Sequence, residues 1–316
     1  MDKINCTMIT EFVFFGLSEN SKYQIHLFLL FLCIYVISFS GNASIILLYN
    51  LSSNLHNPMY FNLANFSFTE ICYISAIVPK MLANFLSERK AISFYGCAIQ
   101  MYCGFLFGSV ECYMLAAMAY DRYNAICRPL SYTTIMSRKV CIQLITGSWL
   151  ISAVNSLIHN ILTFTLPFCG NNTINHFACD VPPVLKLAST DTWINEIVLF
   201  AVGGCVIIVS FVLTMVSYVN IISAIFTIHS SSGRKKALST CTSHFIVVAI
   251  FYGSTTFMYF RPKSEYSLDQ DRLVSVMYTN IAPLLNPFIY SIRNNDVKLA
   301  FVHIINQIKT ESKKLF

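Results

Sequence analysis

The chain carries little charge: Asp, Glu, Lys and Arg make up only 11% of its 316 residues. A soluble domain normally carries about a quarter charged residues. Hydrophobic residues account for 55% of the chain, and the mean hydropathy is +0.60. The apolar residues occur in long blocks separated by short polar segments, which is typical of an all-α protein that crosses a membrane several times.

Further absences narrow the class of function. The sequence has no His-Glu-x-x-His, no Gly-x-Ser-x-Gly and no paired Asp motif, which argues against an intramembrane enzyme. It has no inverted repeat and no paired Gly/Pro-broken blocks, which argues against a transporter or channel. The basic residues behind the net charge of +6 are scattered through loops, so no nucleic-acid partner is expected. No signal-peptide core precedes Gln24.

Seven apolar blocks are each near the roughly 20 residues that a helix needs to cross a bilayer. They lie at about Ile25–Tyr49, Met59–Pro79, Ile99–Tyr120, Val140–Leu162, Ile197–Ile222, Ala237–Tyr259 and Leu273–Ile292. We therefore expect one domain, a seven-transmembrane-helix bundle over residues 25–292. Residues 1–24 form an extracellular tail in this prediction, and residues 293–316 form a cytoplasmic tail.

Apolar residues recur at helical spacing after the seventh block, at Val297, Phe301, Ile304 and Ile308. This spacing predicts a short amphipathic helix on the inner membrane surface. Lys and Arg are somewhat more numerous in the segments that lie inside if the N-terminus is outside, although the first helix alone shows the opposite bias.

An acid and a base, Asp121 and Arg122, stand together at the end of the third block and precede Tyr123. Such a pair can neutralise itself where hydration is incomplete. Arg suits a switch because its charge is permanent and its planar fork can exchange one acceptor for another. On the pair alone, an interfacial arginine that extends its charge to the membrane surface is an equal alternative.

The surrounding residues decide between these two interpretations. Met118–Cys127 reads Met-Ala-Tyr-Asp-Arg-Tyr-Asn-Ala-Ile-Cys and resembles the third-helix signature of the olfactory receptors, a branch of the rhodopsin-like G-protein-coupled receptors. Other motifs of this family follow in order at the ends of the predicted spans, so the resemblance covers nearly the whole chain. They are Gly41-Asn42, Leu55-His56-Asn57-Pro58-Met59-Tyr60, Ser217-Tyr218, the run from Lys236 to His244, and the run from Pro283 to Asn294.

The resemblance implies an odorant receptor of the plasma membrane with its N-terminus outside. Such a receptor binds a small molecule and activates a heterotrimeric G protein of the olfactory stimulatory class, which raises cAMP. An opsin is disfavoured because no Lys occurs between Lys263 and Lys298, and an amine receptor because Ile99–Phe105 contains no carboxylate.

Four cysteines, Cys6, Cys97, Cys169 and Cys179, are expected on the oxidising side, where three full pairings are open to them. The resemblance implies a bridge between Cys97 and Cys179. Ser189 stands where the family has a partner for Cys169, so we expect no bridge within the loop from Cys169. Asn5 is the expected glycosylation site, and Asn171 is the other acceptor that the sequence leaves open.

The resemblance also assigns a switch at the inner end. Arg122 is expected to pair with Asp121 at rest, and to form the G-protein cleft with Tyr218 and Tyr290 when active. In the seventh span, Pro287 removes a backbone donor and so predicts a kink, where Asn286 can satisfy freed groups.

Glu70 and Glu111 are the only acids well inside the spans. We expect them to form a polar pair that shares a proton or holds a sodium ion, the one cofactor considered. Two separate protonated residues that bond to helix backbones are the alternative.

Small, hydroxyl-bearing and aromatic residues fall at matching outer depths on four spans. By resemblance they line the ligand pocket, although such residues also serve ordinary helix contacts in membranes. A lining of this kind, without ionised groups, favours neutral, mostly apolar volatile ligands. The expected lining residues are Gly104, Phe105, Gly108, Ser109, Val202, Val206, Tyr252, Thr255, Thr256, Tyr259 and Thr279.

Overall fold

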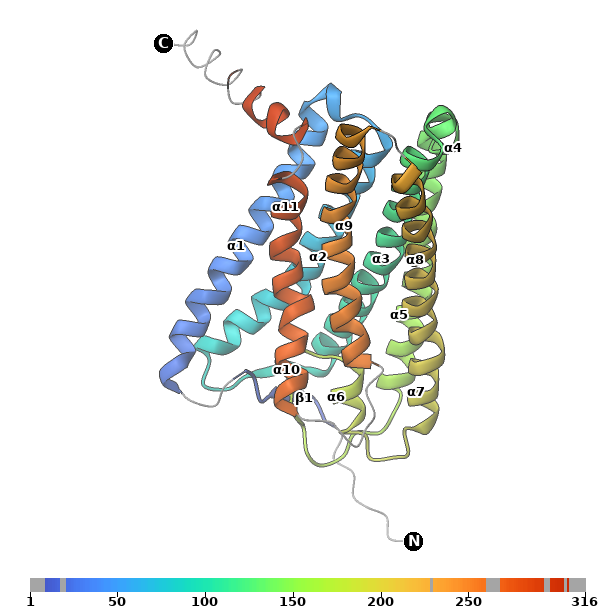
Figure 1. The fold of residues 1–316 in the computed structure, drawn as a ribbon. Helices are drawn as coiled ribbons and strands as arrows, with labels where there is room; N and C mark the ends of the chain where they lie inside the picture. The colour runs from blue at the N-terminus through green and yellow to red at the C-terminus, as the bar shows by residue number, and fades with distance from the viewer. Residues whose placement is uncertain are drawn as a thin grey trace.

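The computed structural model describes residues 9–17, 21–227, 230–259, 268–292, 296–303 and 306. Over these residues the chain is a bundle of long helices (Figure 1). The long helical stretches are α1 (Ser21–Leu51), α2 (Pro58–Leu86), α3 (Phe94–Cys127), α5 (Arg138–Phe164), α7–η3–α8 (Trp193–Thr227), α9 (Ser231–Tyr259) and α10–η5–α11 (Leu268–Ile292). Each contains most or all of one predicted span, and several extend beyond it by a turn or more.

Five of these stretches are long and apolar enough to cross a membrane, and the described part of α9 contributes a shorter apolar segment, Cys241–Phe257. Large apolar side chains point away from the bundle, among them Leu150 on α5 and Val219 on α8, which are 64% and 66% exposed. Exposed apolar surface on this scale is expected only where lipid covers it. The chain is therefore a helical membrane bundle.

Local sequence sets the helix ends and one close contact. The Asn57 side chain accepts a hydrogen bond from the backbone N–H of Tyr60, and Pro58 occupies the first turn of α2. Ser93 caps α3 by accepting from the N–H of Gly96 at 3.1 Å. A Cβ added at Gly41 would lie 3.0 Å from Pro287, so the glycine of the Gly41-Asn42 motif lets α1 approach α11 closely.

Two helical stretches contain π-helical segments, η3 (Leu199–Gly203) before α8 (Gly204–Thr227) and η5 (Met277–Ile281) before α11 (Ala282–Ile292). A π-helical turn adds one residue and rotates the following side chains relative to those before it. Helical spacing cannot predict which residues face inward across such a segment.

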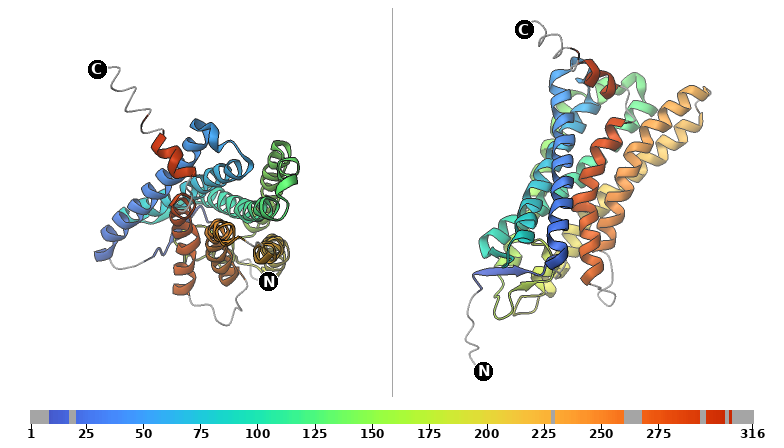
Figure 2. Two further views of the ribbon diagram at one scale, coloured as in Figure 1. Left: turned by 45° about the horizontal axis from the view of Figure 1, so that its top comes forward. Right: turned by 90° about the vertical axis from the view of Figure 1, so that its left-hand side faces the viewer.

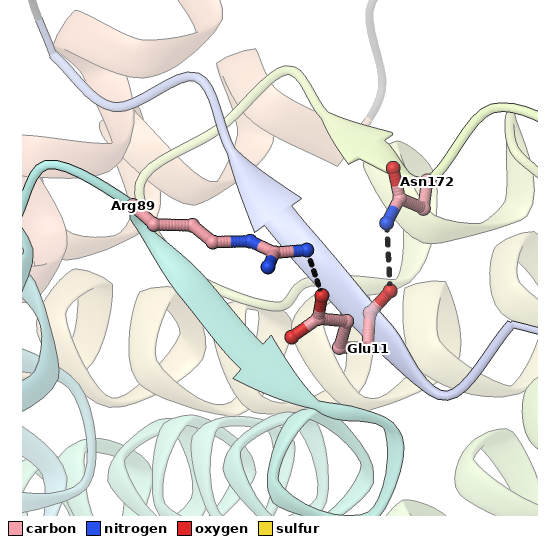
Figure 3. Close-up of polar contacts among 3 residues, drawn as sticks. All are labelled: Glu11, Arg89 and Asn172. Carbon is pink, nitrogen blue, oxygen red and sulfur yellow. Dashed lines mark hydrogen bonds and ion pairs between the residues drawn. The ribbon is translucent and has the colours of Figure 1, made fainter.

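A small sheet covers one end of the bundle. Its order is β2 (Ala91–Ser93), β1 (Glu11–Phe14), β3 (Thr173–Ile174), with β1 antiparallel to β2 and parallel to β3. The Arg89 guanidinium forms an ion pair with Glu11, and the Asn172 side chain donates to the Glu11 backbone carbonyl at 3.0 Å (Figure 3). The sheet thus joins the N-terminal segment to two loops. We call this end of the bundle, with the loop over residues 163–195, the sheet end.

The opposite end carries short helical turns and the last described helix, over residues 296–303 (Figure 2). We call it the Arg122 end. Val297 and Ala300 of that last helix are buried, whereas Phe301 is exposed. Ile304 and Ile308, also predicted on its apolar face, lie outside the described residues. The remaining elements are η1 (Ser53–Leu55), η2 (Pro129–Ser131), α4 (Tyr132–Ile135), α6 (Val181–Leu185), α7 (Trp193–Val198) and α10 (Leu268–Val276).

Candidate functional site: a cavity at the sheet end and a polar cluster at the Arg122 end

A cavity of about 920 Å³ lies among the helices beneath the loop over residues 163–195. Gly104 and Gly108 of α3 face it, and a Cβ added at either would meet nothing within 4 Å. The two glycines thus widen the cavity along α3. The predicted residues Gly104, Phe105, Gly108, Ser109, Val206, Thr255 and Thr279 all belong to the lining.

Three predicted residues lie elsewhere. Val202 is 37% exposed and outside the lining, because the π-helical segment η3 changes which residues of this helix face inward. On α9 the lining is made by Phe251 and Thr255, which are one turn apart. Tyr252 lies beside it, buried, and donates its hydroxyl to the Cys112 carbonyl at 3.1 Å, and Thr256 is exposed. The Tyr259 side chain lies outside the described residues.

The loop over residues 163–195 forms the roof of the cavity. Cys97 at the start of α3 is joined to Cys179 of the loop by a disulfide, which confirms the predicted bridge. Phe177, Ala178 and Cys179 therefore lie over the opening and line it. Ser189 accepts from the Cys169 N–H at 2.8 Å and donates to its carbonyl at 2.9 Å, so hydrogen bonds join the two positions where the family has a bridge.

Cys169 is itself disulfide-bonded, and Cys179 is taken by Cys97, so the bridge of Cys169 does not form within the loop. The predicted acceptor Asn5 lies outside the described residues. Asn171 is at the surface of the loop, where its side-chain oxygen accepts from the Thr173 N–H at 3.0 Å.

The expectation of a lining without ionised groups is wrong at the sheet end. Asp180 and Lys186 of the loop and Glu196 of α7 also line the cavity. The loop and the start of α7 place these side chains there, so the helical spacing of the spans does not reveal them. The deeper walls from α3, α8 and α9 carry apolar and hydroxyl side chains.

His176 joins the roof to the last helical stretch. Its Nε2 lies 3.0 Å from the Ser275 hydroxyl of α10, and its Nδ1 lies 3.1 Å from the Ala178 carbonyl. The pKa of His176 is lowered from 6.5 to about 4, chiefly by burial and also by the nearby charge of Arg272, whereas the bond to Ala178 opposes the shift. The imidazole is therefore neutral at pH 7.

Five of the predicted switch residues, Asp121, Arg122, Tyr123, Tyr218 and Tyr290, lie at the Arg122 end, and all but Tyr123 are buried. Asp121 accepts a hydrogen bond from the Tyr132 hydroxyl of α4 at 2.9 Å, and the Arg122 guanidinium contacts the Met59 sulfur. Among the described residues no ion pair joins Asp121 to Arg122. Consecutive helical residues point in different directions, so the expected direct pair is not formed.

Tyr123, the third predicted residue here, is half-buried and holds the Arg128 guanidinium over its ring at 5.6 Å. It stacks on Tyr120 of the same helix. Its side chain thus packs between α3 and the turn that follows.

The tyrosines of the predicted cleft both approach His244 of α9. The Tyr218 hydroxyl lies 2.6 Å from His244 Nδ1, and the ring centroids of His244 and Tyr290 are 6.5 Å apart. His244 stands in the run from Lys236 to His244, so the motif contained the signal, but spacing did not assign it a role. The three side chains join α8, α9 and α11 close to Arg122.

The acids inside the spans lie between these two regions. Glu70 and Glu111 are each 1% exposed, and Glu70 accepts a hydrogen bond from Asn286, the residue before Pro287 in α11. One carboxyl oxygen of Glu70 and one of Glu111 have no partner among the described residues. Asn42 donates to the Pro283 carbonyl at 3.3 Å and ties α1 to the same stretch.

A membrane-spanning helix bundle with a roofed cavity near one end and a polar cluster near the other is the architecture of a membrane receptor. The sequence comparisons give its family. The family model described as "Olfactory receptor" matches residues 31–308. The chain belongs to the olfactory receptor family, which places it among receptors rather than enzymes.

Individual relatives agree over almost their full length. The chain is 50% identical over 307 residues to "Olfactory receptor 5AR1" of Mus musculus, and the aligned part covers 97% of this chain and 99% of the relative. It is 49% identical over 308 residues to "Olfactory receptor 5W2" of Homo sapiens, with 98% and 99% coverage. It is 48% identical over 305 residues to "Olfactory receptor 5G9" of Mus musculus, with 96% and 97% coverage.

Proposed function

We propose that this chain detects small, neutral, mostly apolar volatile molecules in the cavity and activates an olfactory-type stimulatory G protein, which raises cAMP. The cavity carries this proposal. Its volume of about 920 Å³ suits a small molecule, and its deep walls combine apolar side chains with a few hydroxyls. A charged ligand would lose its hydration against these walls without an ionic partner there.

The proposed site of G-protein coupling is the Arg122 end. Arg122, Tyr218 and Tyr290 are buried among α3, α8, α9 and α11. A relative movement of these helices exposes polar groups that are already present and can bind a partner peptide. The proposal places this end in the cytoplasm and the sheet end outside the plasma membrane, which agrees with a Cys97–Cys179 disulfide on the oxidising side.

A panel screen tests the proposal. Cells that express the receptor and an olfactory-type stimulatory G protein are exposed to neutral volatile compounds while cAMP is recorded. We expect a saturable, receptor-dependent rise for some members of the panel. A complete lack of response with the receptor at the cell surface, or an odorant-gated current in cells without the G protein, contradicts the proposal.

We further propose that Glu70 and Glu111 hold a sodium ion or share a proton in the resting receptor. Each presents a buried carboxyl oxygen that has no partner among the described residues, which fits either occupant. Titration of sodium against the purified receptor should raise its thermal stability, with choline chloride at equal ionic strength as control. Equal effects of the two salts on the wild type, together with unchanged stability of Glu70→Gln and Glu111→Gln, contradict the ion and the shared proton alike.

A further inference from the structure

The hydroxyl groups around the cavity differ in whether the protein already engages them. Six hydroxyl-bearing side chains belong to the lining among the described residues. They are Tyr73, Ser109, Thr192, Thr255, Tyr278 and Thr279. Five of these six hydroxyls have a hydrogen-bond partner in the protein.

The engaged hydroxyls of the helices bond as follows. Thr255 donates to the Phe251 carbonyl at 2.9 Å, and Thr279 donates to the Ser275 carbonyl at 2.6 Å. Bonds of this kind, from a hydroxyl to the preceding turn, use the only proton that the side chain has. Tyr278 donates to the Ser275 hydroxyl at 3.2 Å.

The remaining two engaged hydroxyls pair with other side chains. The Ser109 hydroxyl oxygen accepts a hydrogen bond from the Asn155 amide N–H at 3.3 Å, and Thr192 donates to a carboxyl oxygen of Glu196 at 3.1 Å. Within the described residues, Tyr73 is thus the lining hydroxyl that has no protein partner. Its proton is available to whatever fills the cavity.

Packing fixes the Tyr73 ring, whereas its hydroxyl proton has no acceptor among the described residues. It is on α2, is only 4% exposed, and packs in one apolar cluster with Phe177 and Ala178 of the roof and Tyr278 of η5. A buried tyrosine hydroxyl normally finds a hydrogen-bond partner, because an unpaired donor loses its hydration without compensation. A bound molecule with an acceptor oxygen can supply that partner.

We propose that the Tyr73 hydroxyl donates a hydrogen bond to a carbonyl oxygen of the ligand, which makes aliphatic ketones, aldehydes and esters the preferred class. This inference rests on the proposed odorant function and narrows its ligand class. The carbonyl lies beneath the roof on the α2 side. The hydrocarbon part extends along Gly104 and Gly108, where there is open space beside α3.

The first half of the experiment changes the ligand and keeps the wild-type receptor. Straight-chain 2-alkanones are compared with 2-methyl-1-alkenes of equal length, in which a methylene group replaces the carbonyl oxygen at nearly unchanged shape. In the wild type we expect each alkene to need a roughly tenfold higher concentration for half-maximal cAMP than its ketone, which is the worth of one hydrogen bond.

The second half of the experiment changes the receptor. Tyr73→Phe removes only the hydroxyl, and the same ketones and alkenes are tested on this variant. We expect a roughly tenfold loss of potency for the ketones and no change for the alkenes, so that the preference disappears. Tyr102→Phe on α3 is the matched control, because Tyr102 lies outside the lining, and it should keep the ketone preference.

The outcomes separate the two proposals. A wild type that answers no volatile compound contradicts the proposed function. A wild type that answers volatiles but treats ketone and alkene alike contradicts the inference and leaves the proposed function standing. The same holds if carbonyl compounds are inactive while others activate, or if Tyr73→Phe keeps the wild-type preference at equal surface level.

Discussion

At the residue scale, Gly108 shows how a missing side chain makes space. A Cβ at this position would meet nothing within 4 Å, and Gly108 lines the cavity, so a larger side chain here projects into the cavity. We expect Gly108→Leu to reach the cell surface normally and to lower the potency of its agonists at least tenfold, because the ligand and the leucine occupy the same volume.

Gly147→Leu is the control for this change. Gly147 lies on α5, also has nothing within 4 Å of a built Cβ, and does not line the cavity. Dose–response curves in cAMP, normalised to surface receptor, decide the matter. Unchanged potency in Gly108→Leu means that the ligand binds away from this part of α3.

Arg122 gives a second prediction at this scale. Its guanidinium is largely buried and its Nε has no partner among the described residues, so the surroundings do not fully satisfy its charge in this conformation. Such a group gains partners when the helices move apart. We expect Arg122→Ala to reach the surface but to give less than a tenth of the wild-type cAMP response.

The exposed Lys139 at the start of α5 is the matched control. Lys139→Ala removes a positive charge from the same end of the bundle and should leave signalling within about twofold of the wild type, because a solvated charge makes no defined contact. Normal signalling by Arg122→Ala at equal surface level rules out its role as a switch.

At the element scale, the loop over residues 163–195 depends on one bridge. Cys97 and Cys179 are 82 residues apart, and a disulfide that closes so long a loop stabilises by about 2–4 kcal/mol. We expect Cys97→Ser to lower surface delivery strongly and to abolish the response of any receptor that arrives, because the roof loses its tether to α3.

Cys103→Ser is its control, since Cys103 is a free cysteine on the same helix. Surface immunostaining and cAMP measured in parallel distinguish a folding defect from a pocket defect. If Cys97→Ser and Cys103→Ser behave alike, the bridge does not hold the roof.

The helices, strands and π-helical segments differ in how well the sequence predicts them. Long apolar blocks located the helices, because a bilayer demands runs of that length. The strands β1, β2 and β3 have four residues or fewer and gave no periodic signal. The π-helical segment η3 moved Val202 out of the lining by changing the register, which no count of residues along the chain could reveal.

At the scale of the whole molecule, the cavity draws its lining from parts that helical spacing does not connect. Gly104 and Thr255 could be predicted as lining residues because helical spacing relates residues within one helix. His176 and Asp180 come from a loop whose position depends on the bridge and the sheet. The resemblance identified the family and the bridge, but the polar groups at the sheet end required the fold.

His176 couples the roof to α10, so its protonation affects the stability of the molecule as a whole. Its pKa is about 4 in the folded protein against 6.5 when exposed, because burial disfavours the charged ring. Below pH 6.5 the unfolded chain takes up a proton that the folded chain does not bind. Stability is therefore greatest above pH 6.5 and falls as the pH drops towards 4, where the loss of about 3 kcal/mol is complete.

Thermal unfolding of the purified receptor in lipid nanodiscs between pH 8 and pH 4 measures this loss. The charge of Arg272 faces the same ring and adds to the cost of protonation. His176→Gln keeps a side chain that can bond to Ser275 but does not titrate, so we expect a lower stability at pH 8 and a shallower decline on acidification than in the wild type. The buried His159 and His244 remain in both proteins and contribute equally, so the difference between the two curves isolates His176. Parallel curves would show that the roof stays bonded to α10 whether or not this histidine can be protonated.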